Sequence, residues 1–132
     1  MQEAHAISFY KDIPLSPEKC RKIISTIISS PTQFAWVDEV GGEVNGVLLG
    51  MVDEWIWSRQ KEASDVFFYV NEHSRRAGYF LAKRFMEWAD ARPDVKIKGM
   101  AVSSGIGDVE RTEQLYRRLK MNRVGGIYLK EI

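Results

Sequence analysis

A short basic turn at residues 71–76 leads from an apolar run into an amphipathic segment, and it holds the residues best suited to bind an anion. Arg75 and Arg76 carry charge there, and Gly78 follows in what should be the first turn of a helix. The first N–H groups of a helix have no partner within it, and the positive end of its dipole lies over them. The segment therefore favours a ligand such as pyrophosphate. The alternative is that both arginines belong to a solvated helix start.

The segments on either side should form a parallel crossover. Residues 66–70 are β-branched and aromatic, which is typical of a central strand covered on both faces. A helix is expected from about residue 76 to 92, where Pro93 follows, and residues 95–102 predict another strand. Two strands joined through a helix form a right-handed connection, so these two should be parallel.

The first half predicts a helix and an antiparallel hairpin. Residues 7–10 alternate weakly and predict a short edge strand. Ser16 and Pro17 then suit a helix start, and the helix should carry its apolar stripe on Cys20, Ile23, Ile24, Ile27 and Ile28. Strands are expected at residues 34–40 and about 43–52, joined by a tight turn at Gly41-Gly42, with Asn45-Gly46 as another candidate turn. Residues 53–57 either extend the second strand or turn away from it.

The last part of the chain predicts a capped helix and a final strand. Asp108 is the candidate cap of a helix over residues 110–121, and Gly125-Gly126 precedes a strand at 127–130. The predicted fold class is α/β (α+β), with helices on both faces of a mixed, mostly antiparallel central sheet. Its parallel strand pair should lie at about residues 66–70 and 95–102. We expect residues 1–132 to form one domain.

Composition narrows the partners. Residues 1–65 hold 6 Lys/Arg against 10 Asp/Glu, whereas residues 66–132 hold 13 against 8, so an anionic ligand should bind the second half. A single cysteine, Cys20, excludes an internal disulfide, and the two histidines show no metal-ligand spacing, so no metal is expected. Neither a signal peptide nor a long apolar stretch is evident, which predicts a cytoplasmic protein without a membrane partner. It should be a monomer or a small oligomer such as a homodimer.

At this point residues 34–130 resemble the GCN5-related N-acetyltransferases. The pyrophosphate loop of that family reads Arg/Gln-x-x-Gly-x-Gly/Ala after the fourth strand, and the segment here is Arg75-Arg76-Ala77-Gly78-Tyr79-Phe80. Two of its three signature positions match, and Phe80 stands where a small residue is usual. The segment from Glu113 to Leu119 is similar to the family's Leu-Tyr-x-x-Leu-Gly-Phe, although Lys120-Met121 follows and Val109 replaces a common asparagine. In its compact form the chain looks similar to members encoded in phage genomes.

The resemblance implies acetyl-CoA as co-substrate and transfer of acetyl to a primary amine of a small molecule or peptide, in a direct ternary complex. The pantetheine would lie in a gap between the strand ending at Val70 and the one ending near Ser103, and the thioester carbonyl would bind an N–H near Tyr69 or Val70. The implied cofactor-binding residues are Phe68, Tyr69, Val70, Arg75, Arg76, Ala77, Gly78, Tyr79, Phe80 and Ser103.

Tyr116 matches the family's tyrosine that protonates the departing thiolate, which makes it the candidate catalytic residue. The alternative is a packed tyrosine with its hydroxyl paired. A general base is left unassigned among Asp53, Glu54, Glu72 and a water-mediated route. A non-catalytic CoA-binding or structural module of the same fold is the rival function. Nucleic-acid binding ranks below both, because the basic half lacks interleaved exposed aromatics and a basic stripe.

Overall fold

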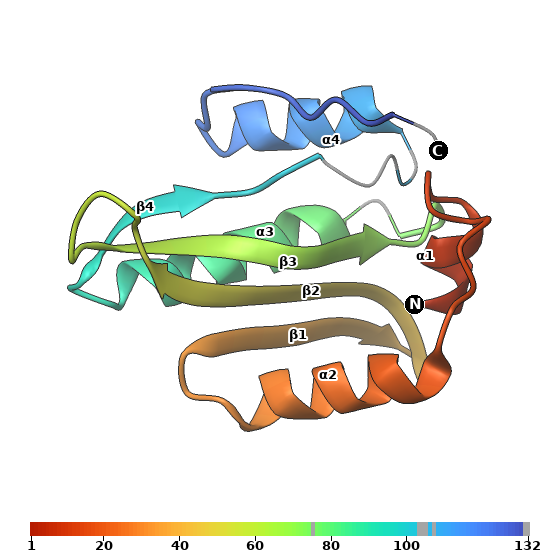
Figure 1. The fold of residues 1–132 in the computed structure, drawn as a ribbon. Coiled ribbons are helices and arrows are strands. Elements are labelled where there is room, and N and C mark those ends of the chain that lie inside the picture. Colours follow the sequence, from red (N-terminus) through yellow and green to blue (C-terminus); the bar gives the residue numbers. More distant parts are fainter. Residues whose placement is uncertain (75, 103–105, 107, 131–132) are drawn as a thin grey trace. The chain divides into compact units, whose positions relative to one another are not determined.

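This computed structural model contains a four-stranded mixed sheet in the order β1-β2-β3-β4 (Figure 1). The structure describes residues 1–74, 76–102, 106 and 108–130. The chain divides into two compact units, residues 16–100 and residues 1–15 with 101–132, and each is considered by itself. The larger unit contains α2 (Pro17–Ser29), β1 (Gln33–Val40), β2 (Glu43–Glu54), β3 (Lys61–Val70), α3 (Ala77–Asp90) and β4 (Val95–Gly99).

The β1–β2 hairpin confirms its sequence prediction. Gly41 and Gly42 both have positive φ, 61° and 83°, which is the backbone that a two-residue turn between twisted strands requires. The alternative turn at Asn45-Gly46 is wrong. Those residues lie within β2, and Gly46 pairs with Asp38 beside an irregularity in the β1 register.

The third strand begins earlier than expected. β3 starts at Lys61 rather than at residue 66, and it pairs antiparallel with β2 along its length. β2 continues to Glu54, and the chain then turns through residues 55–60, where the Trp55 N–H donates to the Gln60 carbonyl at 2.9 Å. The first residues of β3 are mostly polar because a single side chain among them, that of Ala63, is fully buried.

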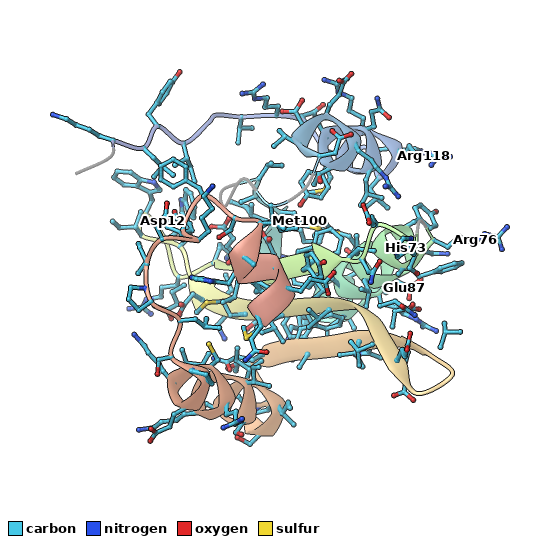
Figure 2. All side chains as sticks on the ribbon, turned by 90° about the vertical axis from the view of Figure 1, so that its right-hand side faces the viewer. Asp12, His73, Arg76, Glu87, Met100 and Arg118 are labelled. Atoms are coloured by element: carbon cyan, nitrogen blue, oxygen red, sulfur yellow. The ribbon has the colours of Figure 1, made fainter. Side chains whose placement is uncertain are left out.

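The mixed sheet confirms the predicted fold class, but the limits of its parallel pair were wrong. β3 and β4 pair in parallel from Lys61 opposite Val95 to Ser64 opposite Gly99. The predicted partners were residues 66–70 and 95–102, yet β4 ends at Gly99. β3 runs on for six residues beyond the last pair, to a turn that carries His73 and Arg76 at one end of the unit (Figure 2).

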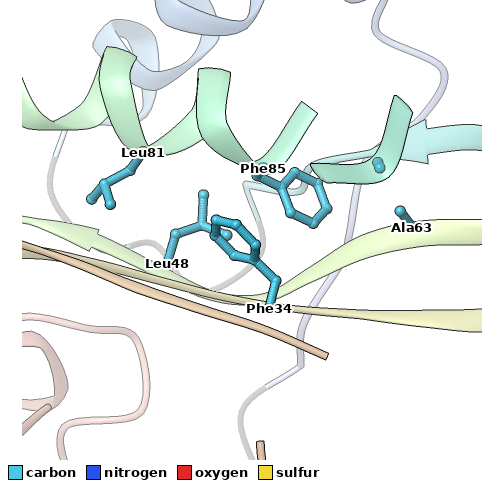
Figure 3. Close-up of a cluster of buried hydrophobic side chains, with 6 residues drawn as sticks. Phe34, Leu48, Ala63, Leu81 and Phe85 are labelled. Carbon is cyan, nitrogen blue, oxygen red and sulfur yellow. The ribbon is translucent and has the colours of Figure 1, made fainter. Parts of the chain in front are cut away.

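The core of the larger unit lies between the sheet and α3. Phe85 packs edge-on against Phe34 of β1, with ring centroids 5.6 Å apart, and Leu48 of β2 lies fully buried beside them (Figure 3). Two glycines of β2 make room for the helix. A Cβ on Gly50 would lie 2.5 Å from Phe85 Cε2, and one on Gly46 would lie 2.9 Å from Leu81 Cδ1. The close approach of α3 to β2 thus depends on these bare positions.

α2 also forms as predicted. The Ser16 side chain accepts a hydrogen bond from the Lys19 N–H at 3.3 Å, and Pro17 occupies the first turn. Ile27 is buried, whereas Ile28 is 68% exposed. α2 packs beside β1 through part of its predicted stripe.

The smaller unit contains α1 (Gln2–Ala6) and α4 (Val109–Arg118), and it corrects two predictions. Residues 7–10 form turns rather than a strand, because the Ser8 hydroxyl donates to the His5 carbonyl and accepts from the Tyr10 N–H. Residues 127–130 belong to no strand, and Tyr128 is 98% exposed. α4 ends earlier than expected, but Asp108 caps it as predicted, accepting from the Arg111 N–H at 3.1 Å. No helix in the described parts of the chain is long and apolar enough to cross a membrane.

We expect Gly50→Ala to destabilise the fold by about 1–3 kcal/mol, because the new methyl group would push against the buried Phe85 ring. Urea denaturation measures the change. Gly125→Ala is the matched control, since nothing lies within 4 Å of a Cβ there, and it should shift the unfolding free energy by less than about 0.5 kcal/mol. Equal stability of the two variants would contradict this account of how α3 packs on β2.

Candidate functional site

The turn between β3 and α3 is fixed by hydrogen bonds of its own. The Asn71 N–H donates to the Asn45 carbonyl of β2 at 2.7 Å, which extends the β2–β3 pairing by one residue. The Asn71 side-chain oxygen accepts from the His73 N–H at 2.9 Å, and its carbonyl accepts from the Ser74 N–H at 3.0 Å. An Asn that bonds the backbone two residues ahead closes a tight turn. The chain therefore enters α3 in a defined geometry.

The start of α3 is open to an anion. Arg76 is the N-cap residue and makes no side-chain capping bond, and the first turn contains no acidic residue. The Ala77 N–H donates to the Ser74 carbonyl and the Phe80 N–H to the Arg76 carbonyl, both at 3.3 Å. Among the described residues, none accepts from the N–H of Gly78, which is buried. The first turn itself thus gives the positive end of the helix dipole no negative partner, and the nearest carboxylate with a hydrogen bond to the turn is that of Asp38 of β1, which accepts from the Ser74 hydroxyl at 3.5 Å.

The side chains around this helix start point outward. Arg76 extends away from the ribbon, beyond His73 (Figure 2). Phe80 is 55% exposed, and its ring meets that of Tyr79 edge-on at 5.9 Å. Since the Phe80 ring is not packed into the core, the large residue at this position does not displace the backbone of the first turn. Arg75, the other predicted basic residue, lies outside the described residues.

β3 changes its environment halfway along. Phe68, Tyr69 and Val70, the predicted pantetheine-binding residues, pair with β2 and lie beyond the last β3–β4 pair. Between the two halves the register shifts, so that Asp65 pairs with Gly50 and Phe67 with Leu49. A bulge of this kind re-aims nearby side chains and is common next to binding sites. The sequence analysis passed over Asp65, although an acid directly before an apolar run is a visible signal.

The paired end of β3 and β4 is held by an ion pair. The Lys61 N–H donates to the Asp94 carbonyl at 3.1 Å, and Lys61 Nζ lies 2.6 Å from Asp94 Oδ2. The hydrogen bond from Lys61 lowers the pKa of the Asp94 carboxyl, and the hydrogen bond with Asp94, together with its charge, raises the pKa of Lys61. This ion pair lies at the opposite end of β3 from Phe68–Val70. β3 is therefore paired with both β2 and β4 near its start, whereas beyond Ser64 its pairing is with β2.

The predicted catalytic residue lies in the smaller unit. Tyr116 of α4 is buried, and its hydroxyl donates to the Ala101 carbonyl at 3.0 Å. Ala101 lies two residues before Ser103, on the segment that the resemblance expects along one side of the pantetheine, so the hydroxyl of Tyr116 is bonded to that segment. The paired hydroxyl also agrees with the alternative of a packed tyrosine. Ser103, predicted to contact the cofactor, lies outside the described residues.

The candidate general bases are not brought together. Asp53 and Glu54 lie at the end of β2, where they pair with Glu62 and Lys61 of β3. Glu72 lies beyond the other end of β3, with its carboxylate 3.6 Å from His73 Nε2, and it is largely exposed. The positions of these three residues do not favour any one of them as the general base.

The arrangement of the elements can be compared with solved structures. A transcriptional regulator from Bacillus halodurans C-125 superposes with a TM-score of 0.76, at 14% identity, over 100% of this chain and 91% of its own. A ribosomal-protein-alanine N-acetyltransferase from Brucella melitensis biovar Abortus 2308 gives 0.62 at 13% identity, over 89% and 82%. An aminoglycoside acetyltransferase from an uncultured soil metagenomic sample gives 0.62 at 15% identity, over 90% and 76%. The fold is that of the GCN5-related N-acetyltransferases.

At these identities the likeness to acetyltransferases concerns the fold. No protein-family model matches the sequence, and no curated protein matches it closely enough to count as a relative. The sequence resemblance expects the cofactor pyrophosphate at the loop after the fourth strand. The β3–α3 turn carries the residues of that loop, but it follows the third strand, since the strand expected at residues 7–10 does not form.

We expect Asn71→Ala to loosen the turn, because the His73 N–H would lose its acceptor. Amide hydrogen exchange at His73 and Ser74 should accelerate by roughly tenfold, the equivalent of about 1.4 kcal/mol of lost protection. Asn71→Asp keeps the accepting oxygen and should exchange as the parent protein does. Identical exchange in the two variants would show that this side chain does not order the turn.

Proposed function

We propose that this chain is an acetyl-CoA-dependent N-acetyltransferase that acts on a primary amine of a small molecule or peptide. The observation that carries the proposal is the start of α3, where the Gly78 N–H faces no acceptor among the described residues and no acid occupies the first turn. The acetyltransferase fold of the chain adds to it. We place the activity in the cytoplasm, with neither a membrane nor a nucleic acid as a partner.

The cofactor pyrophosphate would bind at this helix start. The Gly78 N–H and the helix dipole would meet the phosphate oxygens, and the exposed Arg76 guanidinium would add a charge-assisted hydrogen bond. Arg75 would contribute a second cation. Phe68, Tyr69 and Val70 would follow the pantetheine arm, because they continue β3 beyond the strand pair that ends at Ser64 and Gly99. A backbone N–H of this segment would bind the thioester oxygen as charge develops on it.

Acetyl transfer then requires two proton movements. The attacking nitrogen must be neutral, and it forms the new C–N bond as the C–S bond breaks. The nitrogen loses a proton to a base, for which Asp65 at the β3 bulge joins Asp53, Glu54 and Glu72 as a candidate. Tyr116 would give its hydroxyl proton to the thiolate, exchanging its present acceptor, the Ala101 carbonyl, for the sulfur. No covalent acetyl-enzyme is needed for this route.

A second candidate function is a CoA-binding module without turnover. It is favoured by the Tyr116 hydroxyl, which is buried and already donates to a backbone carbonyl. The Bacillus halodurans protein of similar fold is described as a transcriptional regulator rather than an acetyltransferase. Such a module would use the same helix start for the cofactor, so binding and catalysis must be measured separately.

Binding is tested with acetyl-CoA and two charge variants of α3. We expect Arg76→Ala to weaken acetyl-CoA by roughly three- to tenfold in isothermal titration, since a hydrogen bond to a charged group contributes about 1.5–3 kcal/mol before solvent screening. Lys83→Ala removes the same charge further along the helix, where Lys83 Nζ lies 3.9 Å from Glu87, and should leave the affinity unchanged. If the parent protein shows no binding at millimolar acetyl-CoA, both candidate functions fail.

Catalysis is tested at Tyr116 once binding is established. With an amine from a panel of small amines, aminoglycosides and peptides, Tyr116→Phe should lower kcat by roughly 10²–10⁴-fold and leave the affinity for acetyl-CoA unchanged. The lost hydrogen bond to Ala101 should cost about 1 kcal/mol of stability, so thermal unfolding verifies that the variant is folded. An unchanged kcat, or no acetylated product from any amine, would favour the non-catalytic module.

A further inference from the structure

A half-buried carboxylate of β1 lies beside the start of α3. Asp38 pairs with Gly46 of β2, and residues directly opposite in an antiparallel pair project from the same face, with Cβ positions about 5 Å apart. On that face a Cβ at Gly46 would lie 3.4 Å from Ala77 Cβ and 2.9 Å from Leu81 Cδ1. Ala77 is the first residue of α3. The Asp38 side chain is therefore directed towards the first turn of the helix.

One hydrogen bond joins Asp38 to the turn that precedes α3. Its Oδ2 accepts from the Ser74 hydroxyl at 3.5 Å, although the two residues are 36 positions apart in the sequence. Ser74 belongs to the turn, because its carbonyl accepts from the Ala77 N–H and its own N–H donates to the Asn71 carbonyl. The β1–β2 hairpin thus contributes a carboxylate to the surroundings of the helix start.

The charge of Asp38 is balanced by the helix rather than by a cation. None of the ion pairs among the described residues includes Asp38. A carboxylate near a helix N-terminus is stabilised by the positive end of the dipole, and in return it stabilises the first turn. Because the first turn of α3 contains no acidic residue of its own, Asp38 provides this negative charge from a neighbouring strand.

The same carboxylate opposes an anionic ligand at the helix start. A phosphate group bound there would be favoured by the dipole that favours Asp38, and two negative groups in one partly buried place repel each other. We propose that Asp38 regulates the cofactor site, an inference that rests on the proposed function. Its carboxylate stabilises the start of α3 while the site is empty and repels the pyrophosphate when the site is filled. Asp38 thereby lowers the affinity for acetyl-CoA and speeds the release of CoA after transfer.

Asp38→Asn tests the charge alone, since an amide oxygen can still accept from the Ser74 hydroxyl. Without ligand, exchange of the Phe80 amide, which is bonded to the Arg76 carbonyl, should accelerate roughly two- to fivefold because the helix start loses a negative neighbour. In isothermal titration the variant should bind acetyl-CoA roughly three- to tenfold more tightly, and this gain should shrink as NaCl is added. A residue that merely ordered the turn would, when changed, lower the protection and the affinity together.

Glu62→Gln is the matched control, because it removes one negative charge far from the helix start. Glu62 lies eight residues before Val70 on β3, or about 26 Å at 3.3 Å per residue, so the affinity for acetyl-CoA should stay within about twofold of the parent value. If the parent protein binds acetyl-CoA and Asp38→Asn binds it equally or more weakly, the regulation by Asp38 is overturned and the proposed function stands. If neither the parent nor Asp38→Asn binds millimolar acetyl-CoA, both are overturned.

Discussion

The seating of α3 on the glycines of β2 is the contact on which the larger unit depends. Leu81 and Phe85, one helical turn apart, reach backbone that carries no side chain at Gly46 and Gly50. Interiors are packed too tightly to absorb an extra methyl group there without movement of a buried ring. The position of α3 along the sheet is therefore set by Gly46 and Gly50 of β2. The two ends of the helix are placed by the same contact.

β3 also contacts α3, and its pairing partners change along its length. At its start the Lys61–Asp94 ion pair and the parallel ladder hold β3 to β4, whereas Phe68–Val70 pair with β2. The change falls at the bulge beside Asp65, where one residue of the strand has no counterpart in β2. Because β3 pairs with β4 only up to Ser64, the edge of its last residues that faced β4 carries no β4 pairing next to the turn, while the pairing with β2 keeps the sheet continuous. The Asn71 hydrogen bonds then lead the chain into α3 in a fixed geometry.

The sequence predicted turns and helix starts correctly where a single residue type stabilises the local backbone conformation. Gly41-Gly42, Ser16 and Asp108 each predicted a turn or a helix start that the structure confirms. Long-range pairing decided the rest. The first half of β3 is polar apart from Ala63, so hydrophobic alternation could not show that it was a strand. Residues 7–10 and 127–130 have strand-like side chains but belong to no ladder, and the predicted roles of Tyr116 and the 68–80 segment depend on ligands that no backbone pattern reveals.

Two buried polar groups of the larger unit stand out because the described chain gives neither a partner, and they lie on different elements. One is the Gly78 N–H in the first turn of α3, and the other is Gln33 Oε1 on β1. One is a donor under the positive end of a helix dipole, which suits an anion. The other is a neutral acceptor without accessible surface, which suits an enclosed water more than a ligand from solvent. Because α3 is packed on Gly46 and Gly50 of β2, its first turn is positioned by the core and not by the anion that the open N–H suits.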